Sequence, residues 1–186
     1  MKKLYAYIDG YNFYWGMMDH GNNMPGASYP PPVFRKYLWL NLNTLISSYF
    51  SSDDYYLSKI HYFTAPVRDA PDAIERQEVY WKALESIPHL SICKGSFARR
   101  YDEDGNISRY EEKQSDVNFA LQAFDDALHV PDLSAMVFLC ADSDQVPTVN
   151  RIQGLDKEIE LFYPFLTKFH RFSQVQQVWI VPLQLP

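Results

Sequence analysis

Short apolar runs alternate along this chain with longer stretches in which apolar residues recur every three or four positions. The short runs predict strands at residues 3–8, 55–65, 89–101, 134–141 and 157–164. The longer stretches predict helices at residues 34–50, 69–87, 115–129 and 144–154. Strands that alternate with helices of this length are typical of βαβ units, so the pattern predicts an α/β fold with a mainly parallel, Rossmann-like sheet.

Three segments differ from this simple alternation. Residues 21–32 are rich in turn formers and proline, so we expect a loop there that no helix or central strand crosses. Residues 107–113 follow a DEDGN turn and are expected to return as the second arm of a hairpin. Residues 175–186 are expected to form a last strand or an extended tail. Ser115 has the position of an N-cap for the helix that follows it.

The size and composition of the chain are those of a globular protein. The 186 residues, 47% of them apolar, are expected to form one domain, 1–186. No apolar run approaches the roughly 20 residues that span a bilayer, and the start, MKKLYAYIDG, is predicted to be a strand and not a signal peptide. Cys93 and Cys140 lie in apolar segments and are expected to be buried thiols. The simplest inference is a cytoplasmic protein with no membrane partner.

Charge limits the role that nucleic acid can play. The formal net charge is −6, whereas a protein that only coats nucleic acid would normally be basic. Clustered carboxylates can hold cations, so a nucleic-acid enzyme remains possible if its phosphate-binding surface is local. Lys94, Arg99, Arg100 and Lys113 are candidates for such a basic lip, although RRYDEDG is also typical of a solvated hairpin end.

The pair Asp9–Gly10, directly after the first apolar run, has two interpretations. Asp-Gly between two apolar runs is a common signal for a two-residue hairpin turn. The same letters fit a buried strand that ends in a carboxylate, with a glycine that lets the backbone turn away sharply. The hairpin is the weaker interpretation, because residues 11–21 alternate poorly and the βαβ pattern needs a buried first strand.

Four carboxylates follow predicted strands or begin a predicted helix, namely Asp9, Asp116, Asp142 and Asp144. Ligands of α/β folds bind at the carboxyl ends of the strands, so we expect these side chains to meet there. Converging carboxylates repel one another, and Mg²⁺ relieves this because it prefers oxygen ligands and is often completed by substrate phosphate. Asn12 adds a side chain that could hold a water or a phosphate oxygen. This set predicts metal-assisted hydrolysis of a phosphodiester.

Each of these residues also has a purely structural interpretation. Asp142 or Asp144 could cap the next helix, and Asp116 could simply favour a helix N-terminus through the helix dipole. Histidines at 61, 89 and 170 have no metal-ligand spacing and are expected to be packing or surface residues. No GxGxxG or GxxxxGK[ST] motif is present, so the sequence does not support a nucleotide-binding loop.

Three segments together resemble the NYN domain, the PIN-like nuclease group that includes the LabA and DUF88 proteins. The matching stretches are AYIDGYNFYWG, EEKQSDVNFALQAF and VFLCADSDQVPTV, in the family's order from Tyr5 to about Pro164. The resemblance implies a PIN-like three-layer α/β/α sandwich and ribonuclease activity on RNA with Mg²⁺ or Mn²⁺. By position, it makes Asp9, Asp116, Asp142 and Asp144 the metal ligands, with Asn12 as the accompanying polar residue.

Substrate contacts are expected from Lys113, Arg99, Arg100 and Ser143. The chain departs from the family pattern at three places: Cys140–Ala141 replaces Ser-Gly, Gln114 replaces Gly, and Gln122 stands where a further aspartate is frequent. Two functions therefore stay open, a metal-dependent ribonuclease and a non-catalytic module that binds RNA or a protein. The end of the chain could form an oligomer contact, so a homo-oligomer is a further possibility.

Overall fold

The structure is a computed structural model that describes residues 1–14, 16, 39–68, 70–140, 142–163 and 179–182. Its named elements, in chain order, are β1 (Lys2–Asp9), α3 (Leu42–Ser47), β2 (Tyr55–Thr64), α4 (Pro71–Glu85), β3 (Leu90–Lys94), β4 (Ser96–Tyr101), β5 (Ile107–Lys113), α5 (Ser115–His129), β6 (Leu133–Leu139), η2 (Ser143–Gln145), α6 (Val146–Gln153), β7 (Glu158–Tyr163) and β8 (Trp179–Pro182).

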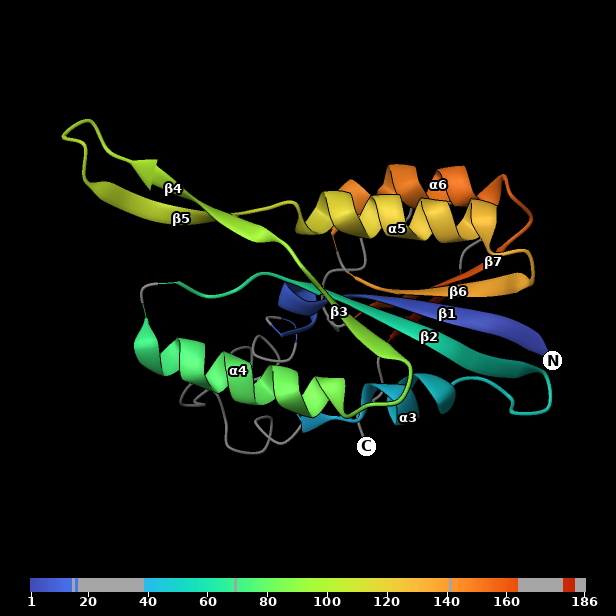
Figure 1. The fold of residues 1–186 in the computed structure, drawn as a ribbon. Coiled ribbons are helices and arrows are strands. Elements are labelled where there is room, and N and C mark those ends of the chain that lie inside the picture. The colour runs from blue at the N-terminus through green and yellow to red at the C-terminus, as the bar shows by residue number, and fades with distance from the viewer. Residues whose placement is uncertain (15, 17–38, 69, 141, 164–178, 183–186) are drawn as a thin grey trace, which may run out of the picture.

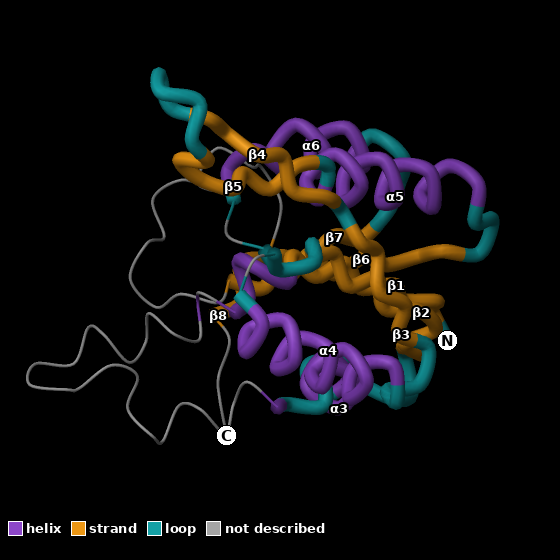
Figure 2. Tube along the Cα trace, turned by 60° about the vertical axis from the view of Figure 1, so that its left-hand side comes forward, coloured by secondary structure: helices purple, strands orange, loops and turns teal. Residues whose placement is uncertain are grey.

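A six-stranded sheet in the order β3-β2-β1-β6-β7-β8 forms the middle layer, and every neighbouring pair in it is parallel. Helices α3 and α4 cover one face of this sheet, and α5 and α6 cover the other (Figures 1 and 2). The predicted mainly parallel sheet and the three-layer α/β/α architecture are therefore confirmed. The described residues contain no helix that combines the length and the apolar character needed to span a membrane.

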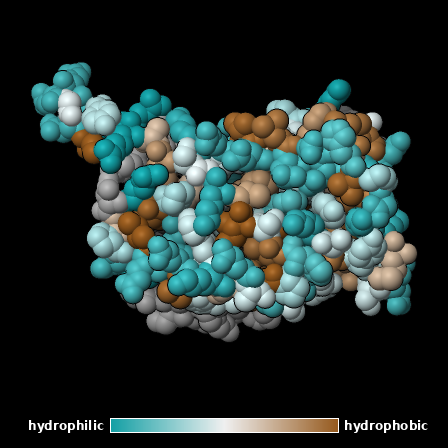
Figure 3. All heavy atoms as spheres, viewed as in Figure 1, coloured by the Kyte–Doolittle hydropathy of each residue, from teal (hydrophilic) through white to brown (hydrophobic). Residues whose placement is uncertain are grey.

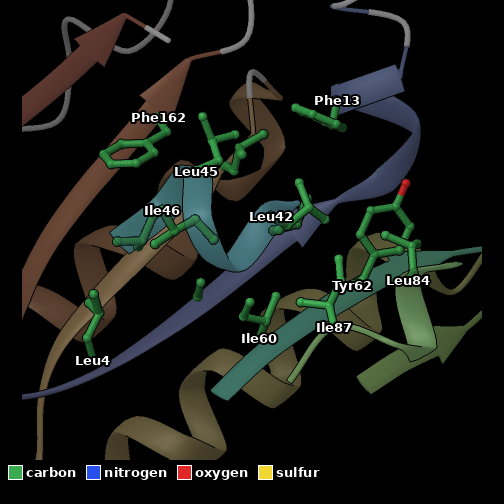
Figure 4. Packing of buried hydrophobic residues seen from close by; sticks show 14 of the residues in the cluster. Leu4, Phe13, Leu42, Leu45, Ile46, Ile60, Tyr62, Leu84, Ile87 and Phe162 are labelled. Atoms are coloured by element: carbon green, nitrogen blue, oxygen red, sulfur yellow. The ribbon is translucent and has the colours of Figure 1, made fainter. Parts of the chain in front are cut away.

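Strand β1 lies in the middle of the sheet and supplies side chains to two hydrophobic cores. Leu4 and Ile8 join the core under α3 and α4, which Figure 4 shows from close by. Tyr7, between them in the chain, points to the other face and packs with Phe119 of α5 and Phe138 of β6. Because successive residues of a strand face opposite sides, a strand covered on both faces reads as a continuous apolar run.

The prediction of one strand over residues 89–101 is wrong. The chain leaves the main sheet at Gly95, so β3 stays in that sheet while β4 pairs with β5 in a separate antiparallel ribbon. The backbone N–H of Gly95 donates to the carbonyl of Thr64, and a Cβ at Gly95 would lie 2.6 Å from Ser115 Oγ and 2.8 Å from Lys113 O. Residues 96–113, called the hairpin arm below, project from the body beyond the carboxyl ends of the strands (Figure 1).

Other predicted segments agree with the structure in part. The expected return of 107–113 as a hairpin strand is confirmed, and the predicted helix at 144–154 is divided into η2 and α6. Residues 34–38 of the predicted helix at 34–50 lie outside the described residues; in the described part, α3 covers Leu42–Ser47, with Asn41 as its N-cap. The last strand predicted within 175–186 is confirmed as β8, and the predicted loop at 21–32 lies outside the described residues.

Candidate metal-binding carboxylate site

Asp9 ends β1 at the carboxyl edge of the sheet, and the hairpin interpretation of Asp9–Gly10 is wrong. β1 pairs in parallel with β2 and β6, and the chain becomes helical at Gly10. Asp9 Oδ1 accepts a hydrogen bond from the backbone N–H of Asn12 at 3.0 Å, as an N-cap residue does. This contact fixes the half-buried carboxylate and places Asn12 beside it.

Position 10 requires glycine because the structure leaves no room for a side chain there. A Cβ there would lie 2.5 Å from Tyr62 Cε1 and 2.7 Å from the carbonyl oxygen of Phe63. The glycines described with a positive φ do not include Gly10, so it is not needed for an unusual turn conformation. The expected role of Gly10 therefore changes: it lets the helix after β1 begin directly against β2.

Asp142 and Asp144 lie in the turn between β6 and α6. Asp142 is the N-cap of η2, and its Oδ1 accepts from the backbone N–H of Asp144 at 2.9 Å. The capping interpretation is thus correct for Asp142. Asp142 is half-buried, as is Ser143, whereas Asp144 is exposed. The turn presents two carboxylates and a hydroxyl at the same edge of the sheet as Asp9.

Asp116 lies in the first turn of α5, and the chain enters this helix in an unexpected way. Gln114, and not Ser115, is the N-cap, and it has a left-handed φ of 79°. Glycine adopts this conformation without the penalty that a side chain brings, so Gln114 holds it at a conformational cost. Ser115 is the first residue of α5, and its hydroxyl is buried without a hydrogen-bond partner among the described residues.

Gln145 joins the two halves of the site and was not anticipated from the sequence. Its side chain is buried, and its Nε2 donates to the carbonyl oxygen of Asp116 at 3.3 Å. The start of α5 is therefore tied to the turn that carries Asp142 and Asp144. A polar residue at the end of an acidic turn gives no sign in the sequence that it bridges to a helix 29 residues earlier.

Electrostatics shows that these carboxylates influence one another. Asp116 is an exposed residue, yet the surrounding protein removes part of the water around its carboxyl group, which raises its pKa. The charges of Asp142 and Asp144 raise this pKa further. Both Asp9 and Asp142 act on the Cys140 thiol, whose pKa is raised well above its ordinary value by burial first and then by these charges. Asp116 therefore feels the charges of Asp142 and Asp144, and the Cys140 thiol lies between Asp9 and the backbone of Asp142.

Cys140 is the second residue of the site that sequence reasoning placed only in the core. Its Sγ lies 3.7 Å from Asp9 Oδ2, with the thiol as donor, and it accepts from the backbone N–H of Asp142 at 3.2 Å. Because its pKa is raised, the thiol keeps its proton and can donate a hydrogen bond to the Asp9 carboxylate. Cysteine thus replaces the serine of the family pattern with another donor. Ala141 lies outside the described residues.

The predicted substrate-binding residues are not all near the carboxylates. Lys113 ends β5, three residues before Asp116, and is half-buried at the base of the hairpin arm. Arg99 and Arg100 lie farther out on β4 and are exposed. The structure therefore places Lys113 and Ser143 at the edge of the site and the two arginines along the projecting arm.

The side chains at this edge limit the kind of cation that could bind there. Among the described residues, no three His, Cys, Asp or Glu side chains are grouped so that they could hold one metal ion together. The available donors are carboxylate oxygens, and Mg²⁺ commonly binds one or two protein carboxylates and keeps several waters. The residues therefore fit a hydrated Mg²⁺ or Mn²⁺ and do not fit a closed structural site of the zinc type.

A separate polar cluster is buried between α5 and the sheet. Asp126 Oδ2 accepts from the Tyr7 hydroxyl at 2.8 Å and lies 3.1 Å from His61 Nε2. Asp126 Oδ1 accepts from Gln122 Nε2 at 3.0 Å. Gln122 is therefore part of this cluster, and His61, expected to be a packing or surface residue, is one of its buried members. The cluster fastens α5 to β1 and β2.

Comparison with known proteins supports the fold and leaves the activity open. No family model matches the chain. It is 26% identical over 184 residues to the 6-hydroxy-3-succinoylpyridine 3-monooxygenase HspA of Pseudomonas putida, with 80% of this chain and 54% of that protein covered. The chain thus spans about half the length of this curated relative. A crystal structure of a Vibrio parahaemolyticus protein of unknown function matches with a TM-score of 0.58 and 14% identity, over 97% of this chain and 93% of that one.

Proposed function

We propose that this protein is a metal-dependent nuclease of the NYN, PIN-like type that hydrolyses RNA phosphodiester bonds. The observation that carries the proposal is the position of four carboxylates at the end of β1, in the turn after β6 and in the first turn of α5; burial, and then the charges of Asp142 and Asp144, raise the pKa of Asp116 there. Carboxylates that destabilise one another's charge are stabilised by a divalent cation placed among them. One or two of the carboxylates of Asp9, Asp116, Asp142 and Asp144 would bind Mg²⁺ or Mn²⁺ directly at this edge, and the others would contact it through its bound waters.

A divalent cation in such a site supplies charge stabilisation for a phosphoryl group and a more acidic water. The protein's own contribution is positioning. The Asp9 carboxylate accepts hydrogen bonds from the backbone N–H of Asn12 and from the Cys140 thiol. The Asp142 carboxylate accepts one from the backbone N–H of Asp144. Lys113 and Ser143 would contact phosphate at the edge, and the exposed Arg99 and Arg100 would extend that contact along the arm.

One observation favours a second candidate, a non-catalytic module that binds RNA or a protein partner. Asp9 and Asp142 both accept backbone N–H groups as cap residues, a role that requires no metal. In that case the role of these carboxylates would be to accept hydrogen bonds from nearby backbone N–H groups. The two candidates differ in whether Mn²⁺ binds.

Asp142→Asn separates these candidates because it keeps the cap acceptor and removes one charge. We expect calorimetric titration to show Mn²⁺ binding to the wild type and at least tenfold weaker binding to the variant, with loss of RNA cleavage. The matched control is Asp53→Asn, an exposed aspartate before β2 at the opposite edge of the sheet. Binding to the wild type should also strengthen as the pH rises through the raised pKa of Asp116.

The outcomes are distinct for each candidate. Absence of Mn²⁺ binding, together with unchanged RNA for single-stranded and structured substrates, would refute the nuclease and favour the non-catalytic module. Equal cleavage by the wild type and Asp142→Asn would also refute the assignment of the site. The name of the Pseudomonas relative suggests a further assay: oxidation of 6-hydroxy-3-succinoylpyridine in the presence of O₂ and a reductant would favour an oxygenase instead.

A further inference from the structure

Helix α5 carries a second apolar stripe on the side that faces away from the sheet. Its core side consists of buried residues, among them Phe119, Ala123 and Ala127. Val117, Leu121 and Leu128 are 59%, 63% and 49% exposed, and Phe124 is half-buried and packs in part against the core. The four positions are separated by four, three and four residues, so at about 3.6 residues per turn they form one stripe, which Phe124 borders on the side of the core.

The surroundings of the stripe make it one continuous surface. Figure 3 shows apolar side chains on the outside of the helices α5 and α6. Arg151 of α6 lies beside the stripe, with its guanidinium carbon 5.9 Å from the ring centroid of Phe124. Scattered exposed apolar residues need no explanation, but an apolar stripe of this spacing bordered by polar residues is typical of an interaction surface.

We propose that this stripe binds a second copy of the chain, with the two α5 helices antiparallel about a twofold axis. The stripe is self-complementary in that arrangement, because an axis between Gln122 and Ala123 brings Val117 of one copy opposite Leu128 of the other and Leu121 opposite Phe124. A four-three spacing of apolar residues is the one that allows two helices to interlock their side chains. A closed twofold interface requires the same patch on both copies, and the stripe meets that requirement.

Charges along the stripe are compatible with this pairing. Asp125, beside the stripe, falls opposite Ala120 of the other copy under the same axis, so the two Asp125 carboxylates do not face each other. Antiparallel helices also place the N-terminus of each near the C-terminus of the other, which is favourable for their dipoles. No like charges lie on the stripe positions themselves.

The surface area that two copies could bury determines the expected affinity of the dimer. The three exposed aliphatic side chains together present on the order of 300 Å² of surface, and with their neighbours the two copies would bury roughly 1,000 Å² in total. This is the lower end for specific interfaces, so the dimer should be reversible and should form at micromolar concentrations. The structure thus favours a concentration-dependent dimer over an obligate one.

Sedimentation velocity of the full chain, from about 1 to 200 µM, tests the proposal. We expect the wild type to shift from monomer to dimer and Leu121→Glu to remain monomeric, with a dissociation constant at least tenfold higher. Val79→Glu is the matched control, because Val79 of α4 is also an exposed aliphatic residue, at 51%, on the other side of the molecule. Far-UV circular dichroism verifies that both variants are folded.

Cross-linking decides the orientation of the helices. A mixture of Val117→Cys and Leu128→Cys chains should form mixed disulfide dimers under mild oxidation, whereas each variant alone should form few. The wild type, with half-buried Cys93 and buried Cys140, is the background control. A monomer at every concentration overturns the proposal, as does a dimer that Leu121→Glu does not weaken. Self-cross-linking of each variant alone would overturn the antiparallel arrangement.

Discussion

Removing the Asp126 carboxylate should destabilise the fold far more than removing an exposed neighbour. Asp126 is buried between α5 and the sheet and accepts from Tyr7 on β1 and Gln122 on its own helix, with His61 of β2 at 3.1 Å. In Asp126→Ala, the Tyr7 hydroxyl, on a side chain with 0% exposure, loses its acceptor. His61 loses its contact with the Asp126 carboxylate.

The magnitude follows from these lost contacts. Each buried donor left without an acceptor costs about 1–3 kcal/mol, and breaking a buried charged network by removing one partner costs about 3–5 kcal/mol. We therefore expect Asp126→Ala to lower the free energy of unfolding by about 3–5 kcal/mol, which corresponds to a loss of roughly 6–20 °C in Tm for a chain of this size. Asp126→Asn keeps an acceptor for Tyr7 and should cost less.

The dependence on pH has a definite sign. Burial acts to raise the pKa of Asp126, but the close contact with His61 and the hydrogen bond from the Tyr7 hydroxyl outweigh it and hold the pKa below the ordinary value of 3.8. A carboxylate whose pKa is lowered by folding contributes stability above its unfolded pKa and loses it as the pH falls through the folded one. The advantage of the wild type over Asp126→Asn should be constant near neutrality and should shrink below pH 3.8.

Urea unfolding at neutral pH, followed by far-UV circular dichroism, measures these differences. Asp125→Ala is the control, since Asp125 is the preceding residue on α5 and forms only an exposed pair with His129. Such exposed pairs contribute about 0–1 kcal/mol. If Asp126→Ala were no less stable than Asp125→Ala, the buried cluster would not fasten α5 to the sheet, and the reasoning would be refuted.

Two further substitutions test the backbone around the candidate site. Gly10→Ala should lower the free energy of unfolding by about 1–3 kcal/mol, because its Cβ would lie 2.5 Å from Tyr62 Cε1 and 2.7 Å from Phe63 O. Gly154→Ala, whose nearest neighbour is 3.5 Å away, is the control, and equal Tm values for the two variants would contradict the steric argument. Gln114→Gly should raise the urea midpoint by an equivalent of about 0.5–1 kcal/mol, because φ at this position is 79°; a lower midpoint would disprove this.

The layered fold could be predicted from local patterns, whereas the hairpin arm could be predicted only in part. Strand β6 reads as a continuous apolar run because both of its faces are covered, so its place in the middle of the sheet follows from the sequence. The division of 89–101 into β3 and β4 does not follow. The residue pattern typical of a strand continues through Gly95. The contacts that exclude a side chain at Gly95 come from Lys113 and Ser115, which are distant in the sequence.

The candidate site shows the same limit. Its carboxylates could be located because parallel strands bring their carboxyl ends to one edge. The hydrogen-bond donors around them could not be located from the sequence. The Cys140 thiol contacts the Asp9 carboxylate, which is 131 residues away, and the Gln145 side chain donates to the backbone carbonyl of Asp116, 29 residues away. The buried cluster around Asp126 was missed for the same reason, since Tyr7 and Asp126 are 119 residues apart and neither has a distinctive local motif.

The break at Gly95 has a consequence for how this chain can vary. The two ends of the hairpin arm adjoin, because Ser96 is the register partner of Lys113 and Gly95 approaches the Lys113 carbonyl. The arm forms its own two-stranded ribbon, separate from the six-stranded sheet. Insertions whose ends are close together can change in length or be exchanged without altering the framework that bears them. This segment is therefore where homologous chains can differ most while β3, α5 and the carboxylate edge keep their places.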